Sequence, residues 1–320
     1  MYPLVERLTV VALLGMKRPS GQAGRVRPFE SPGGQRVLVV AAHPDDETIG
    51  CFATILSHLE CGDSVRVLVV TDGSGSRAGG LGPGEMARAR SLEIKEVSKL
   101  MPGIHLVQLG LVEGHWEAGE LATVLEQQLT QFAPDLVYAP SCVDFHPEHL
   151  KVARAIASAL GMCATRAAGQ LRSVEAPLAA PHARVVAQKG AAPSAPTVRA
   201  YEMQVPLSLE LANRYTPLGR HYQAKARAIA AYRSQRGALD LWRREARYLG
   251  ALLDTPGGAE AFWELPACAY RRVIARGNWD WRTMPFKSLS GRPLGDLTAY
   301  LKGRNARLTL RALAEAEGAA

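Results

Sequence analysis

RVLVVAAHPDDE, at residues 36–47, is the stretch of sequence that decides the fold. After its first residue it runs through six apolar, largely β-branched positions without polar alternation, which is typical of a buried strand. One imidazole and three carboxylates follow within five residues, and residues 48–60 then have a helical pattern. Ligands bind beyond the carboxyl ends of strands in open α/β sheets. The stretch therefore predicts a buried strand with a functional site at its end, and the concentration of negative charge predicts a bound divalent cation.

Strands and helices alternate along the chain as far as residue 160. The pattern predicts further strands at 64–71, 104–109 and 136–139, and helices at 85–100, 117–132 and 148–160. This alternation predicts an α/β fold with a Rossmann-like, doubly wound, mostly parallel sheet flanked by helices. A strand near residues 199–204 would extend the sheet, and residues 209–253 are expected to be helical and basic.

The composition is that of a globular protein with a basic surface. Apolar residues make up 47% of the 320 residues and charged residues 21%, which excludes extensive disorder. The net charge is +8, and much of the surplus lies in residues 199–247 and 271–307. No basic stripe interleaves with stacking aromatic residues, so we expect a solvated cationic surface and no nucleic-acid partner.

The cysteines and the N-terminal segment bear on location. Five cysteines form an odd set without CxxC spacing, which predicts reduced thiols and a cytoplasmic protein. The apolar run at residues 8–16 is too short to span a bilayer and lacks a basic region before it, so we predict neither a transmembrane segment nor a signal peptide. This run could lie along a membrane surface. A helix packed on the protein, or against a second subunit of a homo-oligomer, is favoured.

A second polar cluster, DFHPEH at residues 144–149, also follows an apolar strand and precedes a helix. Pro147 suits the first helical position, which would place His149 in the first turn and His146 just outside it. Either cluster alone could be a set of helix caps or solvated loop residues. Two clusters at matching strand ends can meet above the sheet, and together they predict an open catalytic zinc site with three protein ligands.

Four motifs together resemble a known family. They are Ala42-His43-Pro44-Asp45-Asp46-Glu47, Thr71-Asp72-Gly73, Arg90-x-x-Glu93 and His146-Pro147-x-His149. These residues are similar to those of the zinc-dependent N-acetylglucosaminyl deacetylases of the LmbE/PIG-L type. The resemblance covers residues 34–160 strongly and extends more loosely through 201–202, 232–235 and 261–262.

The resemblance implies a role for each motif residue. His43, Asp46 and His149 would hold one Zn²⁺ per chain, and Asp45 would be the general base. His146, if protonated, would stabilise the oxyanion together with the zinc. Zinc lowers the pKa of water towards neutrality and a free carboxylate beside it can take the proton, so the chemistry is consistent with these roles. The expected products are acetate and a free amino sugar.

Substrate contacts are implied at two further positions. Arg90 matches a position that contacts substrate in the family, although a surface helix pair with Glu93 or Glu96 would explain it equally well. Glu113 stands where the family often places an acidic contact to the sugar. The glycine-rich residues 73–84 are either a lid over the site or a surface loop.

Two more carboxylates are expected to support the site. Glu148 replaces the aspartate that is usual between the two histidines, so its longer side chain could alter a bond that orients His146. Glu47 is expected to lie at the start of the helix, behind the ligands. Residues 232–235 are expected to pack or cap.

These observations predict three segments and leave other functions open. An N-terminal segment and linker (1–34) would precede an LmbE-like domain (35–265) and a helical C-terminal extension (266–320). The expected substrate is a small amino sugar, free, conjugated or lipid-linked. An amidase for another acyl amide (a thiol conjugate or an antibiotic precursor), or a non-catalytic sugar- or nucleotide-binding protein, would keep the same fold. A metal-dependent glycosyltransferase could use Asp45 and Asp46, but it would leave His146 and His149 unexplained.

Overall fold

Two neighbouring interior strands of the sheet are largely apolar on both faces. In the computed structural model, β2 (Arg36–Ala41) is fully buried from Val37 onward, and β3 (Ser64–Thr71) pairs with it in parallel, Val37 lying opposite Val65. Helices cover both faces of the sheet, so neither face of these strands carries the polar residues that a solvated face would need. This explains the unbroken apolar run that precedes His43.

The structure describes residues 26–144, 146–174, 195–203, 205, 207–236, 242–277, 279, 286 and 293–316. Three predicted features lie wholly or partly outside these residues. They are the apolar run at residues 8–16, the first part of the predicted linker, and residue 204 at the end of the strand predicted at 199–204. Among the described helices, none is both long enough and apolar enough to cross a bilayer.

Eight strands of the described chain form one sheet, in the spatial order β1-β7-β8-β6-β5-β2-β3-β4. The others are β1 (Arg27–Pro28), β4 (His105–Leu111), β5 (Leu136–Pro140), β6 (Thr197–Tyr201), β7 (Arg214–Pro217) and β8 (Ala259–Pro266). The five strands from β6 to β4 are parallel, whereas β8 runs antiparallel to both β6 and β7. The mostly parallel, doubly wound sheet predicted from the sequence is confirmed.

The sequence prediction is wrong at one edge of this sheet. Residues 209–253 were expected to be helical throughout, yet β7 lies within them, and part of the expected linker forms β1 beside β7. β7 has only four residues and its pattern is not apolar, so its pairing with β8 decides its conformation. Strand β8, also unpredicted, makes this pairing possible.

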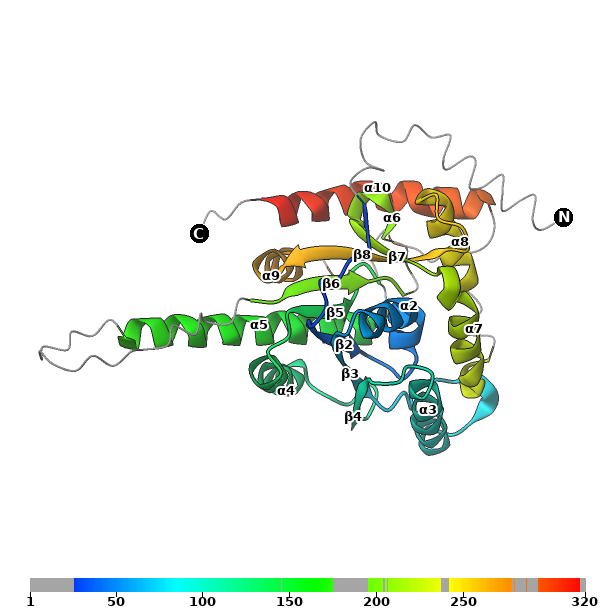
Figure 1. The fold of residues 1–320 in the computed structure, drawn as a ribbon, viewed down its shortest axis with the longest axis horizontal. Coiled ribbons are helices and arrows are strands. Elements are labelled where there is room, and N and C mark those ends of the chain that lie inside the picture. Colours follow the sequence, from blue (N-terminus) through cyan, green and yellow to red (C-terminus); the bar gives the residue numbers. More distant parts are fainter. Residues whose placement is uncertain are drawn as a thin grey trace, which may run out of the picture.

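Helices pack on both faces of the sheet (Figure 1). The α-helices are α2 (Asp46–Glu60), α3 (Pro83–Ser98), α4 (Ala118–Gln131), α5 (Pro147–Val174), α6 (Ser208–Leu211), α7 (Tyr222–Ala231), α8 (Trp242–Leu252), α9 (Ala267–Arg276) and α10 (Pro293–Glu315), and the short 3-10 turns are η2 (Ala78–Gly80), η3 (Gly219–His221) and η4 (Arg233–Gln235). One core packs α4, α5 and α9 on the face that carries Leu38 and Val40, and the other packs α2, α3 and α7 on the face that carries Val37 and Val39. The C-terminal helix α10 lies against α9 and α6.

The winding of the sheet reverses between β2 and β5, which are hydrogen-bonded neighbours. From β2 the chain continues outward to β3 and β4, whereas from β5 it continues in the other direction to β6. A crevice forms at the carboxyl ends of strands where the winding reverses. α2 begins shortly after β2 and α5 shortly after β5, so both polar clusters of the sequence lie at this crevice.

Candidate active site

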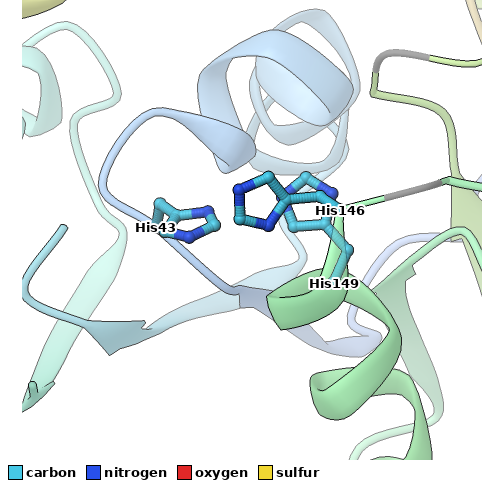
Figure 2. Close-up of side chains that lie close together, drawn as sticks. All are labelled: His43, His146 and His149. Atoms are coloured by element: carbon cyan, nitrogen blue, oxygen red, sulfur yellow. The ribbon is translucent and has the colours of Figure 1, made fainter. Parts of the chain in front are cut away.

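Three histidines meet at the carboxyl ends of β2 and β5. His43 follows β2, whereas His146 and His149 lie at the start of α5. One nitrogen from each ring lies within 4.8 Å of the others, and Figure 2 shows the rings side by side. Nitrogen donors gathered in this way are suited to zinc or another transition metal. The meeting of the two clusters that the sequence predicted therefore occurs.

Asp46 lies between two of these imidazoles. Its Oδ2 is 3.4 Å from His43 Nδ1 and 3.4 Å from His149 Nε2, and it also accepts a hydrogen bond of 2.8 Å from the backbone N–H of His43. Ligands at about 2.0–2.1 Å from a tetrahedral zinc are separated from one another by about 3.3–3.4 Å. Two of the three separations among the residues expected to bind the metal thus match those of ligands to a common ion, and one nitrogen of each histidine, His146 included, lies within 4.8 Å of the others.

The electrostatics of this cluster favour a cation. Burial alone would raise the pKa of the Asp46 carboxyl, but His149 and His43 hold it well below its usual range. Burial likewise opposes charge on His43, yet the Asp46 carboxylate raises its pKa to about 9. The space between these side chains therefore stabilises positive charge.

His146 is in a different electrostatic environment. Burial and the positive charges of His149 and His43 lower the pKa of the His146 ring to about 4. Its Nδ1 is buried and has no hydrogen-bond partner among the described residues. A neutral imidazole can still donate one N–H, so a role as hydrogen-bond donor does not need the protonated form.

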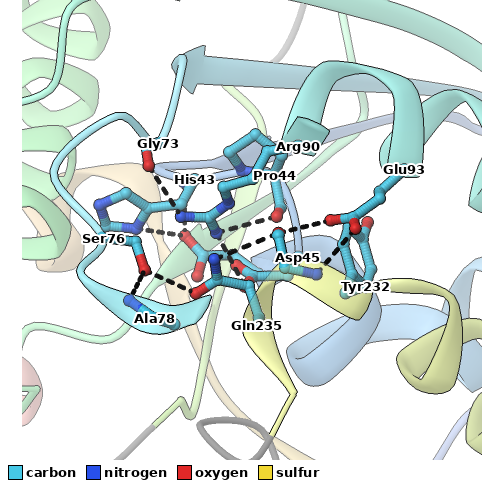
Figure 3. A network of polar contacts seen from close by, with 12 residues as sticks. His43, Pro44, Asp45, Gly73, Ser76, Ala78, Arg90, Glu93, Tyr232 and Gln235 are labelled. Atoms are coloured by element: carbon cyan, nitrogen blue, oxygen red, sulfur yellow. Dashed lines mark hydrogen bonds and ion pairs between the residues drawn. The ribbon is translucent and has the colours of Figure 1, made fainter. Parts of the chain in front are cut away.

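Asp45 is paired with an arginine (Figure 3). Its Oδ2 lies 2.8 Å from the guanidinium of Arg90, and its backbone has a φ of 150°. Burial raises the pKa of Asp45 to about 6, although the charge of Arg90 opposes this. The cavity thus contains a second carboxylate that is separate from the candidate ligand atoms and able to exchange a proton near neutral pH.

Arg90 is buried rather than exposed on α3. Its guanidinium donates hydrogen bonds to the carbonyl oxygens of Pro44 (2.9 Å) and Gly73 (3.4 Å). Of the two helix partners considered as alternatives, Glu93 instead accepts two hydrogen bonds from Ser234, and Glu96 accepts one from Lys99. The surface pair does not form because α3 packs against η4 and Arg90 reaches the loop that follows β2. A contact between Arg90 and a substrate stays a prediction.

Glu113 and the glycine-rich loop form one rim of the site. Glu113 Oε1 lies 3.4 Å from His43 Nε2, and its Oε2 accepts a hydrogen bond from the N–H of Gly75. A Cβ on Gly75 would lie 2.7 Å from this carboxylate, so a larger residue there would displace the Glu113 side chain. Ser76 donates to Gln235 on η4. The loop therefore covers one side of the site, as a lid would.

The carboxylate that contacts two of the histidines was not among the predicted site residues. Asp144 accepts a hydrogen bond from the backbone N–H of His146, and its other oxygen lies 3.3 Å from His149 Nδ1. Glu148, expected to orient His146, instead accepts a hydrogen bond from the indole of Trp116. Asp144 belongs to the second cluster of the sequence, but the cluster alone could not show which carboxylate contacts the rings.

Glu47 connects the site to the YRSQ segment at residues 232–235. The hydroxyl of Tyr232 donates a 2.6 Å hydrogen bond to Glu47 Oε1, and Glu47 Oε2 accepts from the N–H of Asp45 at 3.1 Å. Both side chains are buried. Tyr232 thereby holds the group that fixes the backbone of Asp45, a contact that the sequence did not reveal.

We expect Tyr232→Phe to lower the free energy of unfolding by about 1–3 kcal/mol, because Glu47 would remain buried with one donor fewer. Denaturant unfolding followed by circular dichroism measures this. Tyr222→Phe, at a partly exposed position of α7, is the matched control and should change stability by less than about 0.5 kcal/mol. Equal effects of the two changes would contradict the importance of this bond.

The site opens into a cavity of about 320 Å³. Its polar part contains the three histidines, Asp45, Asp46, Arg90 and Glu113, and its other lining residues include Ile49, Met203, Trp242 and Glu245. A cavity of this size accommodates a small organic molecule, with convergent polar groups to orient it.

Residues 38–160 match the model of the PIG-L family, described as GlcNAc-PI de-N-acetylase. The matched segment contains both polar clusters and Asp45, Arg90 and Glu113. The chain contains a PIG-L family domain. This PIG-L domain begins within β2 and ends within α5, so η4 and α8, which also line the cavity, lie beyond it.

Solved structures share the fold of the PIG-L domain and much of the chain after it. N,N'-diacetylchitobiose deacetylase from Pyrococcus horikoshii is 20% identical, with a TM-score of 0.57 over 74% of this chain and 85% of that chain. The conserved protein TT1542 from Thermus thermophilus is 25% identical, with a TM-score of 0.54 over 72% and 95%. GalB, the 4-carboxy-2-hydroxymuconate hydratase from Pseudomonas putida, is 18% identical, with a TM-score of 0.52 over 72% and 95%. The comparison with curated proteins found no match.

Proposed function

We propose that this protein is a metal-dependent hydrolase that removes the N-acetyl group from an amino sugar or an amino-sugar conjugate, releasing acetate and a free amine. The observation that carries the proposal is the position of Asp45, a buried carboxylate next to the donor set of His43, Asp46 and His149 but paired with Arg90 instead. A metal-assisted hydrolase needs such a carboxylate to move protons. The description of the PIG-L family as a de-N-acetylase supports the choice of substrate.

The proposed cofactor is one Zn²⁺ per chain, held by His43, Asp46 and His149. The 3.4 Å separations of their donor atoms and the two nitrogens among the three donors suit zinc. When bound, the ion would supply Lewis acidity, which lowers the pKa of water and polarises an amide carbonyl. Asp144, beside His149, would fix the orientation of that ring.

The side chains of the cavity would divide the remaining work. Asp45 accepts a proton from the water whose oxygen attacks the acetyl carbon, and it returns this proton to the nitrogen as the C–N bond breaks. His146 donates a hydrogen bond to the carbonyl oxygen as negative charge develops there. Arg90 holds Asp45 in place and keeps its carboxylate available as a base. The free amine and acetate leave as products.

The location and the form of the substrate complete the proposal. None of the five cysteines, all of which the structure describes, forms a disulfide, which supports a cytoplasmic protein. The substrate would be a small amino sugar, free or attached to a nucleotide or lipid. The fold alone does not determine the substrate, since it also occurs in a hydratase. An amidase that acts on another acyl amide is the main alternative.

A substrate panel tests the proposal. Zinc-loaded protein is incubated with free, nucleotide-linked and lipid-linked N-acetylglucosamine and with N-acetyl amino acids. Released acetate and free amine are both measured, and hydrolysis should release them in equal amounts. We expect release from at least one sugar. Release from the amino acids alone would favour the other amidase. Binding of a sugar without any release would favour a non-catalytic sugar-binding protein.

A further inference from the structure

α8 contributes two side chains to the cavity from outside the PIG-L domain. Trp242 and Glu245 both line it, and each is about 5% exposed (5% and 6%). Residues three apart on a helix lie on the same face, so both side chains project in the same direction from α8. The mechanism above uses neither of them.

Glu245 is a buried carboxyl group whose bonding is incomplete. Its Oε1 is buried and has no hydrogen-bond partner in the described part of the chain. Two of the charged groups that act on it, Glu202 and Asp144, are negative, and Lys225 is the positive one. Burial and these carboxylates raise the pKa of Glu245 well above its usual value. A protonated carboxyl can both donate and accept a hydrogen bond, which is what a hydroxyl group also does.

A second buried carboxylate shows what a purely structural glutamate looks like in this fold. Glu260 accepts hydrogen bonds from the N–H groups of Ala53 and Thr54, and it pairs with Lys225 at 2.7 Å. Its bonding is complete and it does not line the cavity. Glu245, by contrast, lines the cavity with an oxygen that is open to pairing with a bound ligand.

The cavity that Glu245 lines also has an apolar part. Trp242, Ile49 and Met203 line the same cavity, and the Trp242 ring is held by Tyr222 with ring centroids 5.5 Å apart. A pyranose ring has one apolar C–H face and an edge of hydroxyl groups. Aromatic surface beside a single hydrogen-bonding group is suited to both parts of such a ring.

We infer that Trp242 and Glu245 recognise the pyranose ring of the substrate, Glu245 by exchanging hydrogen bonds with ring hydroxyls and Trp242 by packing against the C–H face. This inference rests on the proposed function and narrows it. The specificity for a sugar, as opposed to any N-acetyl amine, lies on α8, whereas the reacting groups lie in the PIG-L domain.

Calorimetric titration of N-acetylglucosamine into zinc-loaded Asp45→Asn protein, with and without Glu245→Ala, tests the inference without turnover. We expect Glu245→Ala to weaken binding of the sugar at least tenfold, because a ring hydroxyl would then be buried without its hydrogen-bond partner. Glu245→Gln should restore part of the affinity. In active protein, Glu245→Ala should raise KM for the sugar far more than it lowers kcat.

Thermal unfolding separates recognition from a structural role. Glu245→Gln and Glu245→Ala should leave Tm unchanged or raise it, because a buried group without a complete set of bonds does not favour the fold. Glu260→Gln is the matched control and should lower Tm without changing sugar affinity. If the Glu245 variants lose Tm as Glu260→Gln does, or bind the sugar with unchanged affinity, the inference is wrong. Glu245-dependent binding of a sugar that the active protein never hydrolyses would refute the deacetylation alone.

Discussion

Asp45→Asn is expected to retain about one zinc per chain and to lose about 10²- to 10⁴-fold in kcat, the usual contribution of a general base. Asparagine has the same shape and can still accept a hydrogen bond from Arg90, but it cannot take a proton from water. Asp45 lies outside the donor set, so its change should not release the metal. Acetate release under saturating substrate and metal content by mass spectrometry measure the two effects.

Asp135→Asn is the matched control for this change. Asp135 lies at the start of β5, at the other end of the strands, where it pairs with Arg36. The same substitution there should leave kcat within about twofold, since surface changes distant from such sites have small effects. Normal turnover by Asp45→Asn would overturn the assignment of the base, and loss of zinc from it would place Asp45 among the ligands.

His149→Ala is expected to abolish both zinc binding and turnover. His149 is buried and contacts Asp46, and losing a direct ligand should weaken metal affinity by more than the roughly 10- to 100-fold cost of losing an outer-shell partner. Thermal unfolding gives a readout apart from activity. Zinc at about 1,000 times its Kd should stabilise the wild-type protein by about 4 kcal/mol, and the variant should gain almost nothing at that concentration.

Variants of two other histidines test whether the loss of zinc is specific to His149. His105→Ala, at the exposed start of β4, should keep both the zinc and its stabilising effect. His146→Ala should also keep the zinc but lose turnover, because His146 is proposed to act on the substrate. Loss of zinc from His146→Ala with retention in Asp46→Ala would instead support a site of three histidines, which the geometry also permits.

The site was predictable from the sequence where its parts are local. The apolar run before His43 and the polar cluster before α5 each signal a strand, a strand end and the start of a helix within about a dozen residues. Parallel strands place such ends at one edge of the sheet, so the meeting of His43 with His146 and His149 followed from the pattern. The spacing of their donor atoms about Asp46 did not.

Contacts between distant segments were beyond the sequence. The pairing of Arg90 with Asp45 was missed because the sequence suggested only a substrate contact or a helix pair with Glu93 or Glu96. The bond from Tyr232 to Glu47 joins residues 185 positions apart. Strand β7 was missed because its four residues depend on hydrogen bonds from β8, which no local pattern reports.

By itself, the sequence determined that this chain has a parallel α/β core with candidate metal ligands at two strand ends, because periodicity and strand-end polarity are local properties of the chain. Only the tertiary structure decided that Asp45 is paired with Arg90, that Asp144 contacts the histidines, and that α8 lines the cavity. These contacts depend on how separate helices pack on the sheet. Asp45 and Glu245 become buried only when these helices pack on the sheet. This burial determines the protonation and the hydrogen bonding of their carboxyl groups.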